Sequence, residues 1–331
     1  MNHSTTWRIP RLIGSHTRLY STNSRLAQTF ILPDGRRLGF AEYGSPTGKP
    51  LLYFHGYPSS RIEAAPIDAY ARENNIRVLA LDRPGFGIST RVPNRQMVDW
   101  PQDVKAFADG HGLKQFAVMG LSGGGPFAVA CAHSLPRSML TGVGLFASGP
   151  PWAAGRHYMT RTRRVLSKMA VYWPGALKLL LDLTLGLTRS LSRTGFVTRR
   201  IDTWLEAMRT QKQAENGDGK ETGQRSISQQ REDLLDLLIG EPFAQGTDAM
   251  VQEARILSAD DWGFRLEDVT YGPVRIWHGS KDINAPIEAI RYLAEKLPDA
   301  KLVEFTEDTH YTMGSHINQA VAELMGVDKA K

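Results

Sequence analysis

In GLSGGG, residues 120–125, Ser122 stands among four glycines. This stretch follows the apolar run QFAVM, residues 115–119, and precedes PFAVACA, residues 126–132. A short apolar run is typical of a buried strand, and the second run has the composition of a helix. The sequence therefore predicts a sharp strand-to-helix turn with a serine at its apex, because glycines permit backbone conformations that bulkier residues resist.

Short apolar runs of the same kind recur along the chain and alternate with helical patterns. A hairpin at Asp34-Gly35 precedes them. The predicted strands that follow it are residues 51–54, 76–82, 115–120, 139–148, 274–279 and 301–305. Parallel strands that are covered by helices on both faces have such continuous apolar runs. The sequence therefore predicts an α/β domain with a mostly parallel central sheet.

The strand pattern stops after Pro151 and returns only at residue 274. Residues 152–255 contain helical patterns and no strand pattern, with a polar, glycine-rich stretch at 213–230 that we expect to be a loop. The predicted segments are an N-terminal segment at 1–27, the first part of an α/β core at 28–150, a helical insertion at 151–255 and the second part of the core at 256–331.

The helical insertion is basic. Residues 156–231 hold 15 Lys and Arg against 6 Asp and Glu, a balance of +9. Two interpretations remain open, either solvated helix faces or contact with an anionic acyl substrate or a membrane surface. The apolar side chains of the insertion, among them Trp173, Leu177 and those of residues 180–187, are expected to form a helix-packing face or to line an acyl pocket.

The N-terminal segment has its own composition. The first 33 residues contain four arginines, no acidic residue and many Ser and Thr, whereas the whole chain carries a net charge of +6. This composition is typical of a mitochondrial presequence. The alternative is a disordered basic tail on a cytoplasmic protein.

Several kinds of site are not predicted. The single cysteine, Cys131, lies in an apolar stretch, so no internal disulfide can form and we interpret it as a packing residue. The histidines lack the spacing of a metal cage, and GLSGGG has neither the G-x-G-x-x-G register nor the Lys-Ser/Thr of a phosphate loop. We therefore expect no metal, no cofactor and no nucleic-acid partner.

The turn at residues 120–125 has the pattern of a nucleophile elbow. Gly120, Ser122 and Gly124 match G-x-S-x-G, in which a strained turn lifts the serine hydroxyl above the sheet. The backbone N–H of Gly123 then faces the negative charge that develops on a substrate carbonyl oxygen.

A nucleophilic serine needs a base, and the base needs a carboxylate that orients it. His310 and Asp282 each follow the end of a predicted strand by five residues or fewer, as the arrangement requires. The alternatives are His316, which falls within a helical pattern, and Asp308, which is too near His310 in sequence to orient its ring easily. We favour Ser122, Asp282 and His310.

These motifs together resemble those of the α/β-hydrolase superfamily, in its lid-bearing serine-hydrolase branch, over residues 28–326. They are HGYP at 55–58, DRPGFGIS at 82–89, GLSGGGP at 120–126, HGSKD at 278–282, and His310. The resemblance implies the fold of that superfamily, a lid formed by the helical insertion, and a second oxyanion donor in the backbone N–H of Tyr57. One departure is Thr309, because relatives usually have glycine before the histidine.

The residues and the resemblance predict a serine hydrolase that cleaves a carboxylic ester or thioester of a small apolar or anionic acyl group, through an acyl-enzyme on Ser122. One alternative is hydrolysis of a C–C bond or a lactone in a catabolic or secondary-metabolite pathway. Another is a non-enzymatic ligand- or lipid-binding protein on the same fold.

Overall fold

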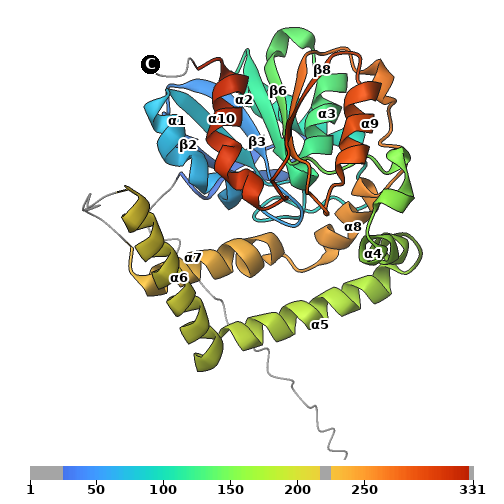
Figure 1. Ribbon diagram of the computed structural model, residues 1–331. Coiled ribbons are helices and arrows are strands. Elements are labelled where there is room, and N and C mark those ends of the chain that lie inside the picture. The colour runs from blue at the N-terminus through green and yellow to red at the C-terminus, as the bar shows by residue number, and fades with distance from the viewer. Residues whose placement is uncertain (1–24, 217–224, 328–331) are drawn as a thin grey trace, which may run out of the picture.

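The computed structural model, shown in Figure 1, describes residues 25–216 and 225–327. Its centre is a sheet of eight strands in the order β1-β2-β4-β3-β5-β6-β7-β8, in which β2 runs antiparallel to β1 and β4 and all other neighbouring strands are parallel. The strands are β1 Gln28–Ile31, β2 Arg37–Gly44, β3 Lys49–Phe54, β4 Ile76–Leu81, β5 Phe116–Leu121, β6 Leu140–Phe146, β7 Val274–Gly279 and β8 Ala300–Phe305.

Helices cover both faces of the sheet, since the inner strands are apolar on both sides. Helices α1 (Asp68–Glu73) and α10 (Ile317–Met325) pack on one face. Helices α2 (Trp100–Gly110), α3 (Gly125–Ser134) and α9 (Ile287–Lys296) pack on the other. The predicted mostly parallel sheet between helices is therefore confirmed.

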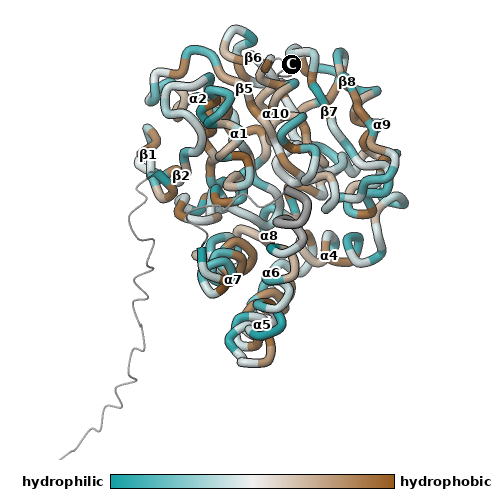
Figure 2. The backbone as a smooth tube through the Cα atoms, turned by 60° about the vertical axis from the view of Figure 1, so that its left-hand side comes forward, coloured by the Kyte–Doolittle hydropathy of each residue, from teal (hydrophilic) through white to brown (hydrophobic). Residues whose placement is uncertain are grey.

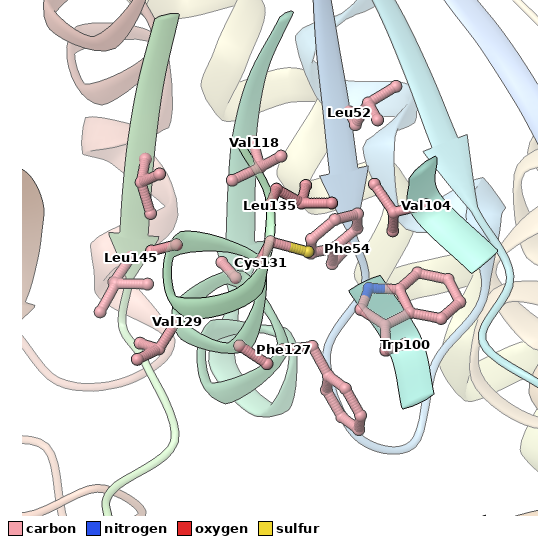
Figure 3. Close-up of a cluster of buried hydrophobic side chains, with 14 of the residues drawn as sticks. Leu52, Phe54, Trp100, Val104, Val118, Phe127, Val129, Cys131, Leu135 and Leu145 are labelled. Atoms are coloured by element: carbon pink, nitrogen blue, oxygen red, sulfur yellow. The ribbon is translucent and has the colours of Figure 1, made fainter. Parts of the chain in front are cut away.

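Cys131 lies in the core between α3 and the sheet. Figure 3 shows its side chain pointing toward Phe54 of β3, and both residues are fully buried. Burial raises the pKa of the Cys131 thiol well above its usual value. The residue is a packing residue, as its apolar neighbours in the sequence suggest.

Residues 1–24 of the predicted N-terminal segment lie outside the described residues, so the mitochondrial presequence stays a prediction. Residues 25–27 contact the sheet. The backbone N–H of Glu42 donates to the carbonyl of Arg25 at 2.8 Å, and the Nε of Arg61 donates to the carbonyl of Leu26 at 2.7 Å.

Five α-helices lie between β6 and β7, on the side of the molecule where β5 and β7 end (Figure 1). They are α4 Arg161–Tyr172, α5 Pro174–Ser192, α6 Gly195–Asn216, α7 Ile227–Leu235 and α8 Asp248–Leu257. The stretch 213–230, expected to be a loop, is helical at both ends, because its first four residues complete α6 and its last four begin α7. The loop prediction rested on glycine and polar content and did not take into account the capping box of Ser226 and Gln229, which starts α7.

The apolar side chains of this segment form the expected packing face only in part, where Leu177 and Leu181 of α5 pack with Ala170 of α4 and Val251 of α8. Trp152 and Leu177 are buried, but Trp173, Leu183 and Leu187 are 63, 64 and 60% exposed. The expectation is wrong for the other side of α5, because the leucines there are exposed to solvent and do not pack on a helix of the described chain. Among the described helices, none is both long enough and apolar enough to cross a membrane.

Buried ion pairs attach the end of the segment to the core. Arg83 pairs with Glu253 of α8, at 2.5 Å between Nη2 and Oε1, and neither side chain is exposed. Arg95 pairs with the other oxygen of Glu253, also at 2.5 Å. Arg61 bridges Asp82 and Glu241 at 3.0 and 2.5 Å. The position of α8 against the sheet is therefore set by charges that no solvent reaches.

Candidate active site

Ser122 stands at the turn between β5 and α3, with a φ of +48°. Side-chain-bearing residues rarely adopt this conformation, so the surrounding chain must hold it. The flanking glycines explain how. A Cβ at Gly120 would lie 2.3 Å from the carbonyl oxygen of Gly124, and one at Gly124 would lie 2.1 Å from the carbonyl oxygen of Phe54. The tight turn therefore requires glycine at both positions.

The structure brings Ser122, His310 and Asp282 together from three strand ends. The Nε2 of His310 lies 3.0 Å from Ser122 Oγ, and its Nδ1 lies 2.6 Å from Asp282 Oδ2. The other oxygen of Asp282 accepts the backbone N–H groups of Asn284 and Ala285 at 2.7 and 2.8 Å. The carboxylate thus orients the ring with Nδ1–H toward itself, which leaves Nε2 free to accept the serine proton.

The alternative residues pair with each other instead. His316 Nε2 lies 3.0 Å from Asp308 Oδ2, and the His316 ring stacks on Phe305 with centroids 4.1 Å apart. His316 lies in the 3-10 turn Thr312–His316 that precedes α10. The two histidine–carboxylate pairs are separate, and only the one with His310 contacts Ser122.

Tyr57, expected to offer an oxyanion donor, lies directly beside the elbow. A Cβ at Gly123 would stand 3.2 Å from the backbone nitrogen of Tyr57 and 2.5 Å from its Cβ, so the two backbones are adjacent. The Tyr57 hydroxyl donates to the carbonyl of Met250 in α8 at 2.8 Å. The loop that carries Tyr57 is therefore held at both its backbone and its side chain.

His55 and Arg83 hold the loop that carries Tyr57 through hydrogen bonds to its backbone. His55 Nε2 accepts the backbone N–H of Arg83 at 3.1 Å, so its Nδ1–H donates to the carbonyl of Gly56 at 2.8 Å. The Arg83 guanidinium donates to the carbonyls of His55 and Gly56. Burial, with the nearby Arg83 cation, lowers the pKa of His55 well below its usual value, so the ring is neutral.

Glu63 is a part of the site that the sequence analysis missed. Its Oε2 accepts the backbone N–H of Gly56 at 2.7 Å and the hydroxyl of Tyr53 at 3.1 Å. Burial raises the pKa of the Glu63 carboxyl, and the bond from Gly56 opposes that rise. Glu63 belongs to no sequence motif. The 3-10 helix Arg61–Ile67 turns the chain back, and this turn brings the Glu63 carboxylate to Gly56.

Arg163 of α4 was also missed. It lines a cavity of about 540 Å³ together with Ser122, Tyr57, His310 and Leu257. Among the described residues, no carboxylate lies within ion-pair distance of it. Burial lowers the pKa of the guanidinium, and the Asp282 carboxylate opposes that effect. The sequence showed a basic insertion but not that Arg163 is the basic side chain that lines the cavity at Ser122.

A second cavity, of about 620 Å³, lies on the other side of α8. Its walls include Arg95, Val251 and Trp262, and neither Ser122 nor His310. The helix α8 thus separates two hollows, and only the smaller one contains the hydroxyl–imidazole pair.

A family model described as alpha/beta hydrolase fold matches residues 49–316. Among solved structures, the enol-lactonase from Burkholderia xenovorans LB400 aligns with a TM-score of 0.58 and 18% identity, covering 91% of this chain and 98% of that one. At this identity the likeness shows the fold alone.

Two curated relatives match shorter stretches, and both are named pimeloyl-[acyl-carrier protein] methyl ester esterase. The protein from Aromatoleum aromaticum is 39% identical over 61 residues, which cover 18% of this chain and 24% of that protein. The protein from Chromobacterium violaceum is 35% identical over 92 residues, covering 28% of this chain and 36% of that one. The chain thus aligns with about a quarter of the first relative's length and about a third of the second's.

Proposed function

This chain belongs to the α/β hydrolase fold family, and on that premise we propose that it is a serine hydrolase that cleaves carboxylic esters or thioesters. The observation that carries the proposal is the hydrogen-bonded chain from Ser122 Oγ through His310 to Asp282. The esterase names of the two curated relatives support the ester class of reaction.

The proposed mechanism assigns one role to each side chain. His310 Nε2 takes the proton of Ser122 as Oγ attacks the carbonyl carbon, and Asp282 stabilises the resulting imidazolium. His310 then protonates the leaving alkoxide or thiolate, which leaves an acyl group on Ser122. Water repeats the cycle, giving up its proton to His310 and releasing the acid and the free serine.

The proposed oxyanion donors are the backbone N–H groups of Gly123 and Tyr57. A preorganised donor of this kind is typically worth about 3 kcal/mol in the transition state. The N-terminus of α3, which begins at Gly125, adds the positive end of a helix dipole close to the same oxygen. The bonds of Arg83 and Glu63 to the Tyr57 loop support this role, because they keep the donors in position before substrate arrives.

The test is covalent labelling of the full chain with a fluorophosphonate, together with hydrolysis of p-nitrophenyl butyrate. Ser122→Ala should abolish labelling, and His310→Ala should lower kcat/KM by more than about a thousandfold. The matched control is His316→Ala, which should retain normal activity. An adduct on Ser122→Ala, or full turnover by His310→Ala, would overturn the assignment.

We further propose that α4 and α8 act as a lid that selects the acyl group. Arg163 of α4 and Leu257 of α8 support this, since both line the cavity over Ser122. A part-buried guanidinium without a carboxylate partner in the described chain favours a substrate that brings its own anion. The proposed substrate class is therefore an ester whose acyl chain ends in a carboxylate or another anion.

Paired substrates test this selection. Arg163→Gln should lower kcat/KM for p-nitrophenyl hemiglutarate by roughly tenfold to a hundredfold, because a hydrogen bond to a charged group is lost. The same variant should hydrolyse p-nitrophenyl butyrate nearly normally. The matched control is Arg164→Gln, which is next in sequence but does not line the cavity. Equal losses on both substrates would contradict the selection of an anion.

A further inference from the structure

Helix α5 is apolar around most of its circumference yet projects from the body of the protein. Eight of its 19 residues are leucines, and Leu177 is its only buried one. A helix that is apolar all round is normally buried on all sides. The outward leucines are Leu179, Leu180, Leu183, Leu187 and Leu191, each between 44 and 64% exposed. At 100° per residue these five fall within an arc of about 120° that contains no charged residue.

The neighbouring helices extend this apolar surface. Helix α4 packs on one end of α5, and α6 follows its other end. The exposed large apolar side chains on these helices and at the α4–α5 junction include Val165, Tyr172, Trp173, Phe196, Trp204 and Met208. Figure 2 shows α5 at the lower boundary of the molecule, well away from the sheet. We call the eleven side chains named here and above on α4, α5 and α6, with Trp173 between α4 and α5, the apolar face.

Basic side chains flank the apolar face. On α4, Arg161 and Lys168 share one side of the helix with Val165, because the three are four and three residues apart. At the junction of α5 and α6, Arg199 and Arg200 are exposed, and the Arg200 guanidinium lies 5.9 Å over the Phe196 ring. In the part of the chain that the structure describes, no carboxylate pairs with any of these four cations.

The charge pattern distinguishes the surfaces that could cover this face. A second copy of the chain would bring its own unpaired arginines against these, and like charges across an interface are unfavourable. A bilayer with anionic headgroups matches both components, since leucines can enter the acyl region while Arg and Lys side chains reach the phosphates. Tyr172, Trp173 and Trp204 of the apolar face are residue types that favour the headgroup level of a membrane.

We propose that the apolar face docks α4, α5 and α6 onto the surface of an anionic phospholipid bilayer. The leucines of α5 insert among the acyl chains, and Arg161, Lys168, Arg199 and Arg200 contact headgroup phosphates. This docking is independent of the proposed hydrolysis, because no residue of the apolar face lines the cavity at Ser122.

The test is co-sedimentation of the full chain with sucrose-loaded vesicles. Vesicles of phosphatidylcholine with about one third phosphatidylglycerol should bind the protein, and added salt should weaken the binding. Leu183→Ser/Leu187→Ser and Arg199→Gln/Arg200→Gln should each lower the partition coefficient about tenfold or more. Circular dichroism and thermal unfolding should show that both double variants remain folded.

Matched controls lie on the core. Ile31→Ser removes an equally exposed apolar side chain from β1, and Lys114→Gln/Lys301→Gln removes two exposed cations. Both should bind vesicles as the unaltered chain does, and so should Ser122→Ala. Absence of binding to the anionic vesicles overturns the proposal, as does an equal loss in the Lys114/Lys301 variant. So does a dimer, in sedimentation velocity, that Leu183→Ser/Leu187→Ser converts to a monomer without vesicle binding.

Discussion

Leucines occupy opposite environments in two regions of this molecule. Leu79 of β4 lies between two helical layers and has no exposed surface, whereas Leu183 of α5 is 64% exposed. Both residues are leucine, but only Leu79 is covered by contacts within the chain. Packing within the chain explains why the core is apolar. It does not explain the exposed apolar side chains of the projecting helices α5 and α6.

Ion pairs repeat the contrast. The Arg83–Glu253 pair is inaccessible to solvent and holds α8 against the loop at Gly56. The Arg231–Asp202 pair joins α7 to α6, with side chains 19 and 30% exposed. Water screens the Arg231–Asp202 pair but not the Arg83–Glu253 pair. Breaking the two pairs should therefore lower the free energy of unfolding by unequal amounts, although their distances are similar.

The largest effect should come from removing one charge of the inner pair. Glu253→Gln leaves Arg83 and Arg95 buried without a counter-charge, and we expect a loss of about 3–5 kcal/mol in the free energy of unfolding. Asp202→Asn on the projecting helices should cost less than about 1 kcal/mol. Urea unfolding of both variants measures the difference. Similar costs at the two sites would remove the distinction between the regions.

Truncation of one leucine in each region gives the next effect. Leu79→Ala should lower the free energy of unfolding by about 2–5 kcal/mol, because it leaves a cavity in a close-packed core. Leu183→Ala should change it by no more than about 0.5 kcal/mol, since its side chain is already in water. Thermal and urea unfolding test the pair. A large loss from Leu183→Ala would mean that α5 packs more closely than its exposed stripe indicates.

The smallest expected effect is a dependence of stability on pH that comes from His278, a buried residue of the core. Burial lowers the pKa of His278 in the folded chain, so below the unfolded value of about 6.5 the unfolded chain binds the extra proton. Stability from this histidine is thus present above about pH 6.5 and is lost as the pH falls toward the folded pKa. The slope is at most about 1.4 kcal/mol per pH unit.

Replacing the imidazole isolates its share of that loss. His278→Gln keeps an N–H donor for the carbonyl of Ala285, which His278 Nε2 contacts at 2.8 Å, but it cannot titrate. The decrease in unfolding free energy between about pH 7.5 and 5.5 should therefore shrink by roughly 1 kcal/mol in the variant. An unchanged decrease would show that His278 binds its proton equally in the folded and unfolded chain.

Much of the fold was predictable because its signals are local. The apolar runs of β3 to β8 and the glycines around Ser122 each follow from packing or backbone demands on adjacent residues. Asp282 and His310 were predicted in the same way, because each closely follows an apolar run that forms a strand. Glu63, Arg163 and Glu253 were not found, because each acts on a segment distant in sequence and none stands in a recognisable motif.

The sequence by itself determined the parallel sheet, the serine at the sharp turn and the helical insertion with its excess of positive charge. The folded arrangement alone shows which basic side chain faces the cavity at Ser122, which acid pairs with the arginine beside the Tyr57 loop, and that five leucines of α5 are exposed. The reason is physical. Periodicity reports which side of an element is apolar, whereas burial and charge pairing depend on what the folded chain brings against that side.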